Sequence, residues 1–525
     1  MALAWRRPGS AVAVPSGAPV HSGAVFVRPA ASTAWTRRRA ITLALVAIVA
    51  LGGGLRAQQA VSPGKYLSTD EHSYASVALH LAKTGHYGSP TMGDPWHWAP
   101  GTPALFAAAH LAAPRADGTG GAKTLRTAFW AQALVGTALI IVMFFLAAGI
   151  GGPFAGLAAA ALIATYPPLI KATGDLVSEP LGALTLALAI MALLATWRRP
   201  SRRNFALTGA LFGAALLVRA DLLIVPSLVG VAWMVLGRNR FTPGERVAHA
   251  CAITIIPLLV ALPWIAFASS HAGRLIPIAS SGPSTLFVGT YLPGGGKMSG
   301  VKRDLEVYVR HQMPNVRHIS RPNLKAEWVL LAYARERHPE LVDPRGYQIS
   351  PEHMRYALAY ETRRNLKTYL VGHPLAFAGM EFSKVGRMWG DYSRGGTRNP
   401  RGWLTAWHLA LLALALGGSI AGLAFARRRQ PEMLLLLTPV LASTAINSIF
   451  VAQARHNLRV LPLLVACGAG GAVLAAQELR DRRRSGFPPE ADPPGDQITA
   501  ERRALDSKIL VTRGPGARVT SRSAR

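Results

Sequence analysis

The chain has 525 residues, half of which are hydrophobic, and only 16% of them are charged. A soluble globular chain carries roughly 25% charged residues, so this composition argues against a soluble enzyme. The 57 Lys and Arg against 26 Asp and Glu give a net charge of +31, which lies mostly in short Arg clusters between long apolar runs. A nucleic-acid-binding protein would concentrate this charge in one soluble domain, whereas cytoplasmic loops of multispanning membrane proteins carry such clusters.

The N-terminal stretch, 1–34, is rich in Ala, Pro, Gly and Ser, and we predict that it is a disordered cytoplasmic arm. The first apolar run, at about 40–55, follows the three arginines Arg37, Arg38 and Arg39. Positive residues beside a span stay in the cytoplasm, so these arginines hold the N-terminus inside and direct the first span outward.

Nine more apolar runs are predicted to span the membrane. They lie at about 124–149, 153–170, 180–197, 204–218, 221–237, 247–269, 403–426, 432–451 and 458–477. When the spans alternate in direction, every later Arg cluster in a short connection falls on the cytoplasmic side. These clusters lie at 198–203, 238–246, 427–429 and 480–484. The sequence therefore predicts a multi-pass protein of the cell's plasma membrane with both termini in the cytoplasm.

Two long segments lie outside by this count. The first, 56–123, contains a short apolar stretch at 102–113 that predicts a helix lying at the membrane interface. The second, 271–402, is polar and is predicted to form a small extracytoplasmic domain. Its start, 278–300, is rich in Gly, Pro and Ser and is predicted to be a loop. Helices are predicted in its later parts, at 323–338 and 352–371.

The predicted fold class is thus an all-α polytopic membrane protein with a bundle of about 10–12 transmembrane helices and amphipathic helices in its outer loops. After the N-terminal arm come a transmembrane module at 35–270, the extracytoplasmic domain at 271–402, C-terminal transmembrane helices at 403–480 and a disordered cytoplasmic tail at 481–525.

Polar and ionisable residues gather in four of the predicted outer connections, at one face of the membrane and at about one depth. They are Asp70, Glu71 and Tyr74; then Lys171, Asp175 and Glu179; then Arg219 and Asp221; and last Arg455, His456 and Arg459. Ionisable groups at such positions are costly, so their gathering predicts a functional site.

Each of these residues also has a structural interpretation. Ser68 and Glu71 fit a capping box, in which Glu71 would only begin a helix over 74–81. Asp175 would cap the next helix, and the arginines would meet lipid phosphates. Jointly these interpretations are weaker, because they must explain acids and bases in four separate connections on the same face.

Acids and arginines at the outer face of a membrane suit one reaction in particular. A carboxylate serves as a general base that takes a proton from an acceptor hydroxyl. Cations stabilise the charge of a leaving phosphate. Together they suit the attack of a hydroxyl on a sugar whose leaving group is a lipid phosphate.

Several motifs, in order along 40–480, resemble those of GT-C glycosyltransferases. The pattern is similar to that of the dolichyl-phosphate-mannose-protein mannosyltransferase-like and lipid A aminoarabinose transferase-like group. The motifs are Asp70-Glu71 with Tyr74, Ala78, Leu81 and Gly85; Trp98-Ala-Pro-Gly-Thr-Pro103; Tyr166-Pro-Pro168 with Ser178-Glu179-Pro180; His373-Pro374 with Lys384 and Trp389; and Arg455-His-Asn-Leu-Arg-Val-Leu-Pro462.

This resemblance implies an inverting hexosyl or pentosyl transferase that uses a polyprenyl-phosphate-linked sugar on the extracytoplasmic face. It implies that Asp70 is the general base and that Glu71 positions the acceptor or the base. The residues implied near the donor phosphate are Lys171, Arg455 and Arg459. The supporting residues are Tyr74, Asp175, Glu179, Arg219 and His456.

The chain also departs from the family pattern. Many members carry Arg two residues after the Asp-Glu pair, where this chain has Ser73, so contacts to donor or acceptor differ from the characterised groups. No Asp-x-Asp motif stands in the first outer loop, and no metal ligands are assigned. His72, His86 and His97 lack the spacing of a zinc site and are interpreted as structural or surface residues. A divalent metal is left open as a cofactor.

Two other function classes compete. A secondary transporter would place polar sites and broken helices at the membrane midplane, where these spans carry almost no ionisable residues. A non-catalytic lipid-binding membrane protein would tolerate replacement of Asp70. The predicted partners are the polyprenyl-phosphate sugar, membrane lipids and a lipid, glycan or protein acceptor, with no nucleic acid; the sequence names neither sugar nor acceptor.

Overall fold

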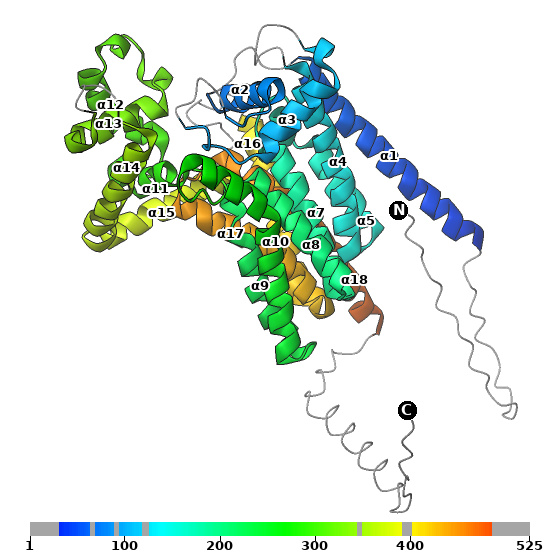
Figure 1. Cartoon of the computed structure of the whole chain (residues 1–525). Coiled ribbons are helices and arrows are strands. Elements are labelled where there is room, and N and C mark those ends of the chain that lie inside the picture. Colours follow the sequence, from blue (N-terminus) through cyan, green and yellow to red (C-terminus); the bar gives the residue numbers. More distant parts are fainter. Residues whose placement is uncertain are drawn as a thin grey trace, which may run out of the picture. The chain divides into compact units, whose positions relative to one another are not determined.

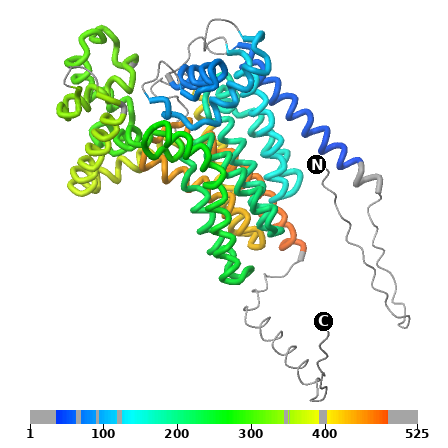
Figure 2. The backbone as a smooth tube through the Cα atoms, viewed as in Figure 1, coloured from blue at the N-terminus to red at the C-terminus, as the bar shows by residue number. Residues whose placement is uncertain are grey.

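The computed structural model describes residues 31–62, 69–88, 94–117, 125–343, 349–390 and 402–485. Within these ranges every regular element is helical, and no strand occurs (Figures 1 and 2). The predicted all-α polytopic fold is therefore confirmed. Most of the predicted N-terminal arm and the C-terminal tail beyond residue 485 lie outside the described residues, as does Ser68.

The chain divides into two units, 1–44 and 45–525, with the boundary inside helix α1 (Ala31–Val61). In the first unit the arginines Arg37 to Arg39 are exposed, and the Thr42 hydroxyl donates to the Arg38 carbonyl over 3.1 Å. All sites described below belong to the second unit.

In the described part of the chain, eight helical segments are each long and apolar enough to cross a membrane, so the protein is a multi-pass membrane protein. Seven of the predicted spans correspond to single helices, and the 221–237 span is made by η3 (Ala220–Leu222), α9 and η4 (Gly237–Asn239). The helices are α1, α4 (Arg126–Gly151), α7 (Glu179–Arg198), α9 (Val225–Leu236), α10 (Pro243–Ala272), α16 (Gly402–Phe425), α17 (Gln430–Ile449) and α18 (Leu461–Ser485).

The two other predicted spans differ from simple transmembrane helices. The 153–170 run is broken into α5 (Pro153–Thr165) and α6 (Pro167–Thr173), which meet at an angle of 57°. Successive prolines at 167 and 168 follow Tyr166, and the residue before a proline is disfavoured in helical conformation. The 204–218 run forms α8 (Arg202–Val218), whose 17 residues extend only about 26 Å. It packs between α7 and α10.

The first span is longer than the sequence predicted. It was expected to end near residue 55, because Arg56 follows, but α1 continues to Val61 and Arg56 is fully buried. The Arg56 guanidinium donates to the carbonyls of Ile163 and Ala164 at 3.0 and 3.1 Å. These carbonyls lie at the end of α5, where the helix break leaves them without helical partners.

The first outer segment forms two helices that pack together, α2 (Thr69–Thr84) and α3 (Gly101–Ala112). The short apolar stretch predicted at 102–113 is thus a helix of 12 residues. Phe106 of α3 and Ala75 and Ala78 of α2 share a buried core with Phe129 of α4. This core fixes the start of α2, which carries the candidate acids.

The predicted extracytoplasmic domain is helical throughout its described part. Its helices are α11 (Gly282–Thr290), α12 (Met298–Gln312), α13 (Ala326–Arg337) and α14 (Pro351–Asn365), followed by a π-helical turn at 366–371 and α15 (Pro374–Gly390). Helices α11 to α14 share one core, to which Val451 also belongs, and are called the α11–α14 subdomain below. The loop predicted at 278–300 was wrong in part, because α11 lies within it and buries Phe287 and Val288. The apolar run of α11 is too short to predict a helix among the surrounding Gly, Pro and Ser residues.

Candidate active site

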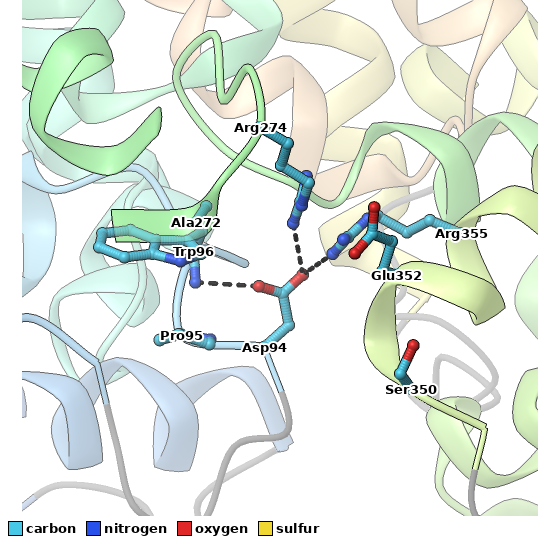
Figure 3. A pocket seen from close by; sticks show the side chains of 8 residues that line it. All are labelled: Asp94, Pro95, Trp96, Ala272, Arg274, Ser350, Glu352 and Arg355. Atoms are coloured by element: carbon cyan, nitrogen blue, oxygen red, sulfur yellow. Dashed lines mark hydrogen bonds and ion pairs between the residues drawn. The ribbon is translucent and has the colours of Figure 1, made fainter. Parts of the chain in front are cut away.

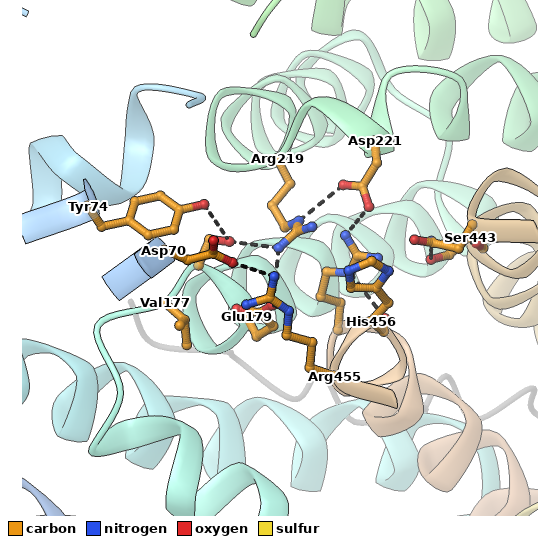
Figure 4. Close-up of polar contacts among 12 residues, drawn as sticks. Asp70, Tyr74, Val177, Glu179, Arg219, Asp221, Ser443, Arg455 and His456 are labelled. Carbon is orange, nitrogen blue, oxygen red and sulfur yellow. Dashed lines mark hydrogen bonds and ion pairs between the residues drawn. The ribbon is translucent and has the colours of Figure 1, made fainter. Parts of the chain in front are cut away.

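Charged side chains from four separate connections meet in one cluster (Figure 4). Asp70 lies in the first turn of α2 and Glu179 in the first turn of α7. Arg219 ends α8, and Asp221 lies in the short η3 turn before α9. Arg455, His456 and Arg459 come from η11 (Ala454–Arg459), which joins α17 to α18. The structure thus brings together these residues of the four predicted connections.

One half of the cluster links the first and last connections. Arg455 forms an ion pair with Asp70 through its Nη2 atom, and its Nε lies 3.7 Å from Glu179 Oε1. Arg219 Nη1 lies 3.5 Å from the same Glu179 oxygen. Glu179 therefore sits between two guanidinium groups that come from different parts of the chain.

The other half is built around Asp221. Its Oδ1 accepts from Arg219 Nε at 3.1 Å, and its Oδ2 pairs with Arg459. The Ser178 hydroxyl accepts from Arg219 Nη1 at 2.7 Å and from the Tyr74 hydroxyl at 3.2 Å. These contacts tie helices α2, α7 and α8 and the η11 turn into one continuous network.

The network is closed at one end and open at the other. Side chains of Arg459 and Glu179 are 0% and 3% exposed, whereas those of Asp70 and Arg455 are 29% and 30% exposed. A molecule arriving from solvent or lipid therefore reaches Asp70 and Arg455 first.

The environment keeps Asp70 ionised. Burial opposes the charged form, but the charge of Arg455 and its hydrogen bond outweigh this effect, and the pKa of Asp70 lies below its ordinary value. The pKa of His456 also lies well below its ordinary value, but here burial is the main cause and the neighbouring Arg459 and Arg455 add to it. At neutral pH the site thus holds a carboxylate base and an uncharged imidazole.

Local sequence explains how these groups are placed. Asp70 and Glu179 both occupy first turns of helices, where the positive end of the helix dipole favours a carboxylate. Gly182, one turn into α7, leaves room for the cations: a Cβ there would lie 3.2 Å from Arg219 Cδ and 3.7 Å from Arg459 Cγ. A larger residue at this position would push both arginines out of place.

Three buried nitrogens of the cluster have no hydrogen-bond partner among the described residues: Arg455 Nε, His456 Nδ1 and Arg459 Nη2. A buried guanidinium N–H without an acceptor costs free energy, so such a group is normally satisfied by water or by a ligand. The Arg459 nitrogen suits an anionic oxygen, which fits the predicted phosphate site.

The remaining predicted residues lie in other surroundings. Glu71 is 2% exposed, in contrast to its partly open neighbour Asp70. Asp175 is buried between α6 and α7, and its backbone carbonyl accepts from Gln132. It does not cap α7, whose N-cap is Ser178. Lys171 is exposed on α6, so its predicted place near the donor phosphate stays a prediction.

The sequence analysis did not single out Ser178, Gly182 or Trp98 as site residues. Ser178 directly precedes Glu179 and is the hydroxyl shared by Tyr74 and Arg219. The Trp98 ring lies 4.5 Å from that of Tyr74, measured between centroids. Trp98 and Ser178 lie within two of the motifs that carry the family resemblance, which was the signal that could have marked them as site residues.

In the described part of the chain, no group of three or more His, Cys, Asp or Glu is placed to hold a metal ion.

Comparison with known proteins gives a match of part of the chain to one family model and a similar fold. Residues 121–267 match the model of the family described as dolichyl-phosphate-mannose-protein mannosyltransferase. The archaeal oligosaccharyltransferase AglB from Archaeoglobus fulgidus, solved with an inhibitory peptide and a dolichol-phosphate, superimposes with a TM-score of 0.51 at 15% identity. That superposition covers 91% of this chain and 55% of that one, so the chain spans about half the length of the oligosaccharyltransferase.

A second solved structure, ArnT from Cupriavidus metallidurans bound to undecaprenyl phosphate, matches with a TM-score of 0.37 at 14% identity, over 88% of this chain and 82% of that one. A comparison with curated proteins finds no match. The partial family match and the fold shared with AglB agree with the resemblance expected from the sequence motifs.

Proposed function

We propose that this protein is an inverting glycosyltransferase that moves a hexose or pentose from a polyprenyl-phosphate donor to a hydroxyl acceptor at the extracytoplasmic face of the plasma membrane. The observation that carries the proposal is the open end of the charged cluster, where a partly exposed carboxylate, Asp70, meets a partly exposed guanidinium, Arg455. One group accepts a proton and the other binds a phosphate.

Asp70 is the base in this proposal. Its carboxylate is ionised because Arg455 offsets its burial, and it is the more open of the two adjacent acids. The acceptor hydroxyl gives its proton to Asp70 as its oxygen attacks the anomeric carbon. The bond from that carbon to the phosphate oxygen breaks, and the polyprenyl phosphate leaves with the electron pair, which inverts the anomeric carbon.

The arginines bind the phosphate of the donor and of the leaving group. Arg455 offers a planar fork that binds two phosphate oxygens, and the buried Arg459 has a nitrogen free of partners among the described residues. Both arginines are held by acids, Asp70 and Glu179 in the first case and Asp221 in the second. Lys171 would add a flexible cation at the outer side.

Donor binding also affects the base. A phosphate that shares the Arg455 guanidinium weakens its pairing with Asp70, and a carboxylate with less cationic support is a stronger base. The site would therefore hold Asp70 in a weakly basic state until the donor arrives. Glu179 lies between Arg219 and Arg455 and keeps their guanidinium groups near each other while the phosphate takes over part of the Arg455 pairing from Asp70.

The comparisons support the lipid-phosphate donor. The AglB structure contains a dolichol-phosphate, and the family matched over 121–267 is described by its dolichyl-phosphate-mannose donor. The acceptor is a hydroxyl of a lipid, glycan or protein. A transporter or a lipid-binding protein is less well supported, because the charged cluster is built from the connections between the spans and not from their middle.

A strain without this protein provides the test. Glycolipids, cell-wall glycans and glycoproteins of the parent, the deletion strain and strains complemented with wild type or Asp70→Asn are compared by mass spectrometry. We expect one glycan class to lose a single hexose or pentose in the deletion strain, with restoration by wild type only. Identical glycans in all four strains, or restoration by Asp70→Asn, would contradict the proposal.

A further inference from the structure

A second polar cluster lies beside the first outer segment, away from the pairs described above. It surrounds a cavity of about 230 Å³ with Asp94 at its centre (Figure 3). Its lining comes from three parts of the chain: residues 94–96 of the first outer segment, 272–274 at the end of α10, and 350–355 at the start of α14. The cavity therefore marks the place where the first outer segment meets the α11–α14 subdomain.

The Asp94 carboxylate contacts all three of these parts. Asp94 Oδ1 accepts from the Trp96 backbone N–H at 3.1 Å, and Oδ2 accepts from Ser280 Oγ at 2.6 Å and from Arg355 Nη1 at 2.8 Å. Arg274 Nη2 lies 3.8 Å from the same oxygen. The Ser280 N–H also donates to the Trp96 carbonyl at 2.8 Å. The Asp94 side chain is largely shielded from solvent, so these contacts are stronger than those of a surface pair.

A continuous set of contacts leads from this carboxylate to the candidate base. Two residues after Trp96, the Trp98 ring stacks on Tyr74, which lies one helical turn after Asp70 in α2. The Tyr74 hydroxyl in turn donates to Ser178, a member of the charged cluster. The first outer segment is thus held at Asp94 and touches the site through Trp98.

We propose that Asp94 is a positioning residue for the candidate active site, which holds Trp98 against Tyr74 and thereby keeps Asp70 in contact with Arg455. Asp94 itself touches none of the proposed reacting groups. Because Arg355 belongs to α14, the same carboxylate couples the placement of the α11–α14 subdomain to the geometry of the base. The inference rests on the proposed function, but its structural consequence is measurable without any sugar donor.

Hydrogen exchange of the purified full-length protein in detergent tests that consequence. In Asp94→Asn the amide oxygen still accepts from the Trp96 N–H, but the amide nitrogen cannot accept from Ser280 or Arg355. We expect exchange of the α2 and α14 amides to rise about tenfold, as for loss of one hydrogen bond to a charged group. Asp304→Asn, which removes the partner of the exposed Arg303 in α12, is the matched control and leaves α2 unchanged.

The pH dependence of sugar transfer separates positioning from a merely structural role. The charged and titratable groups that face Asp70 are Arg455, Arg219, His97 and Tyr74. Removing the negative charge of Asp94 would by itself lower the pKa of nearby acids, whereas a looser Asp70–Arg455 pair raises it. The acid limb is the fall of the transfer rate toward low pH. We therefore expect this limb to lie roughly one pH unit higher in Asp94→Asn than in wild type. A loss of folded protein would scale the rate equally at every pH.

The outcomes separate clearly. Unchanged exchange in α2, or an acid limb that stays in place or moves downward, overturns the inference. If Asp94→Asn does not fold, Ser280→Ala removes one donor and leaves Arg355 paired; a smaller rise in α2 exchange is then expected, and none would reject the inference. If the wild-type protein transfers no sugar, the proposed function fails, whereas the exchange experiment still decides whether Asp94 holds α2.

Discussion

Asp70 and Arg455 are separated by 385 positions in the sequence and form an ion pair at the open end of the charged cluster. The pair joins the first outer segment to the connection between α17 and α18. Because the charge of Arg455 keeps the half-buried Asp70 carboxylate ionised, and Asp70 in turn holds the guanidinium in place, the pair keeps both groups in the states that the proposed reaction requires.

Replacing Asp70 by Asn should abolish most sugar transfer while leaving the fold intact. The amide keeps the size of the side chain but cannot accept the proton, and loss of a general base typically costs about 10²–10⁴ in rate. Transfer by purified wild type and variant is compared together with thermal unfolding. Glu71→Gln is the neighbouring control; if it loses more activity than Asp70→Asn, the base is assigned to the wrong acid.

Replacing Arg455 by Lys should weaken phosphate binding although the charge is kept. A single ammonium cannot replace the planar fork that binds two oxygens, so we expect roughly tenfold weaker binding of undecaprenyl phosphate to the purified protein. Native mass spectrometry with undecaprenyl phosphate and the uncharged undecaprenol measures this. Arg303→Lys, in an exposed pair on α12, is the control. Equal binding of both lipids by wild type would contradict a phosphate site.

The acid limb of kcat/KM, which reports the donor-free enzyme, should lie below the ordinary range of an Asp carboxyl. An unperturbed Asp carboxyl titrates at about 3.9, and Arg455 lowers the pKa of Asp70 further, so Asp70 stays ionised until the pH falls through that lowered pKa. The same sign applies to stability: the pair stabilises the fold above the unfolded-state pKa and is lost toward acid. His456 is already uncharged at neutral pH, so His456→Gln should not move the limb. A limb near pH 6.5 that disappears in this variant would assign the titration to His456.

The sidedness of the protein is predicted to follow its Arg clusters. Native Cys251 is exposed and is first replaced by Ser, whereas Cys467 is buried. A cysteine introduced at Gly295 should then react with an impermeant maleimide in spheroplasts, and one at Arg428 should react only after lysis. The reverse pattern would place the charged cluster on the cytoplasmic side and remove the proposed reaction from its face.

Much of this arrangement could be predicted, because a bilayer demands long apolar helices and short connections expose their ends on one side or the other. From the order of the spans alone, Glu179, Arg219 and Arg455 are expected to lie at the same membrane face. The order of the spans does not say which acid meets which cation, because pairing depends on helix packing and not on spacing. It also misplaces the end of the first span, since the buried Arg56 has its hydrogen bonds satisfied not by an acid but by carbonyls at the break between α5 and α6.

The pair Asp221–Arg459 gives the last prediction, which concerns stability. Arg459 is fully buried and Asp221 is its acidic partner, so Asp221→Asn leaves a buried guanidinium without a counter-charge. Breaking such a pair from one side should destabilise the fold by about 3 kcal/mol. Removing both charges, in Asp221→Asn with Arg459→Gln, should cost less than Asp221→Asn alone, because no uncompensated charge stays buried. Thermal unfolding in one detergent compares wild type, both single variants and the double variant. If the two single effects simply add, the pair is not coupled, and Arg459 must be neutralised by another group.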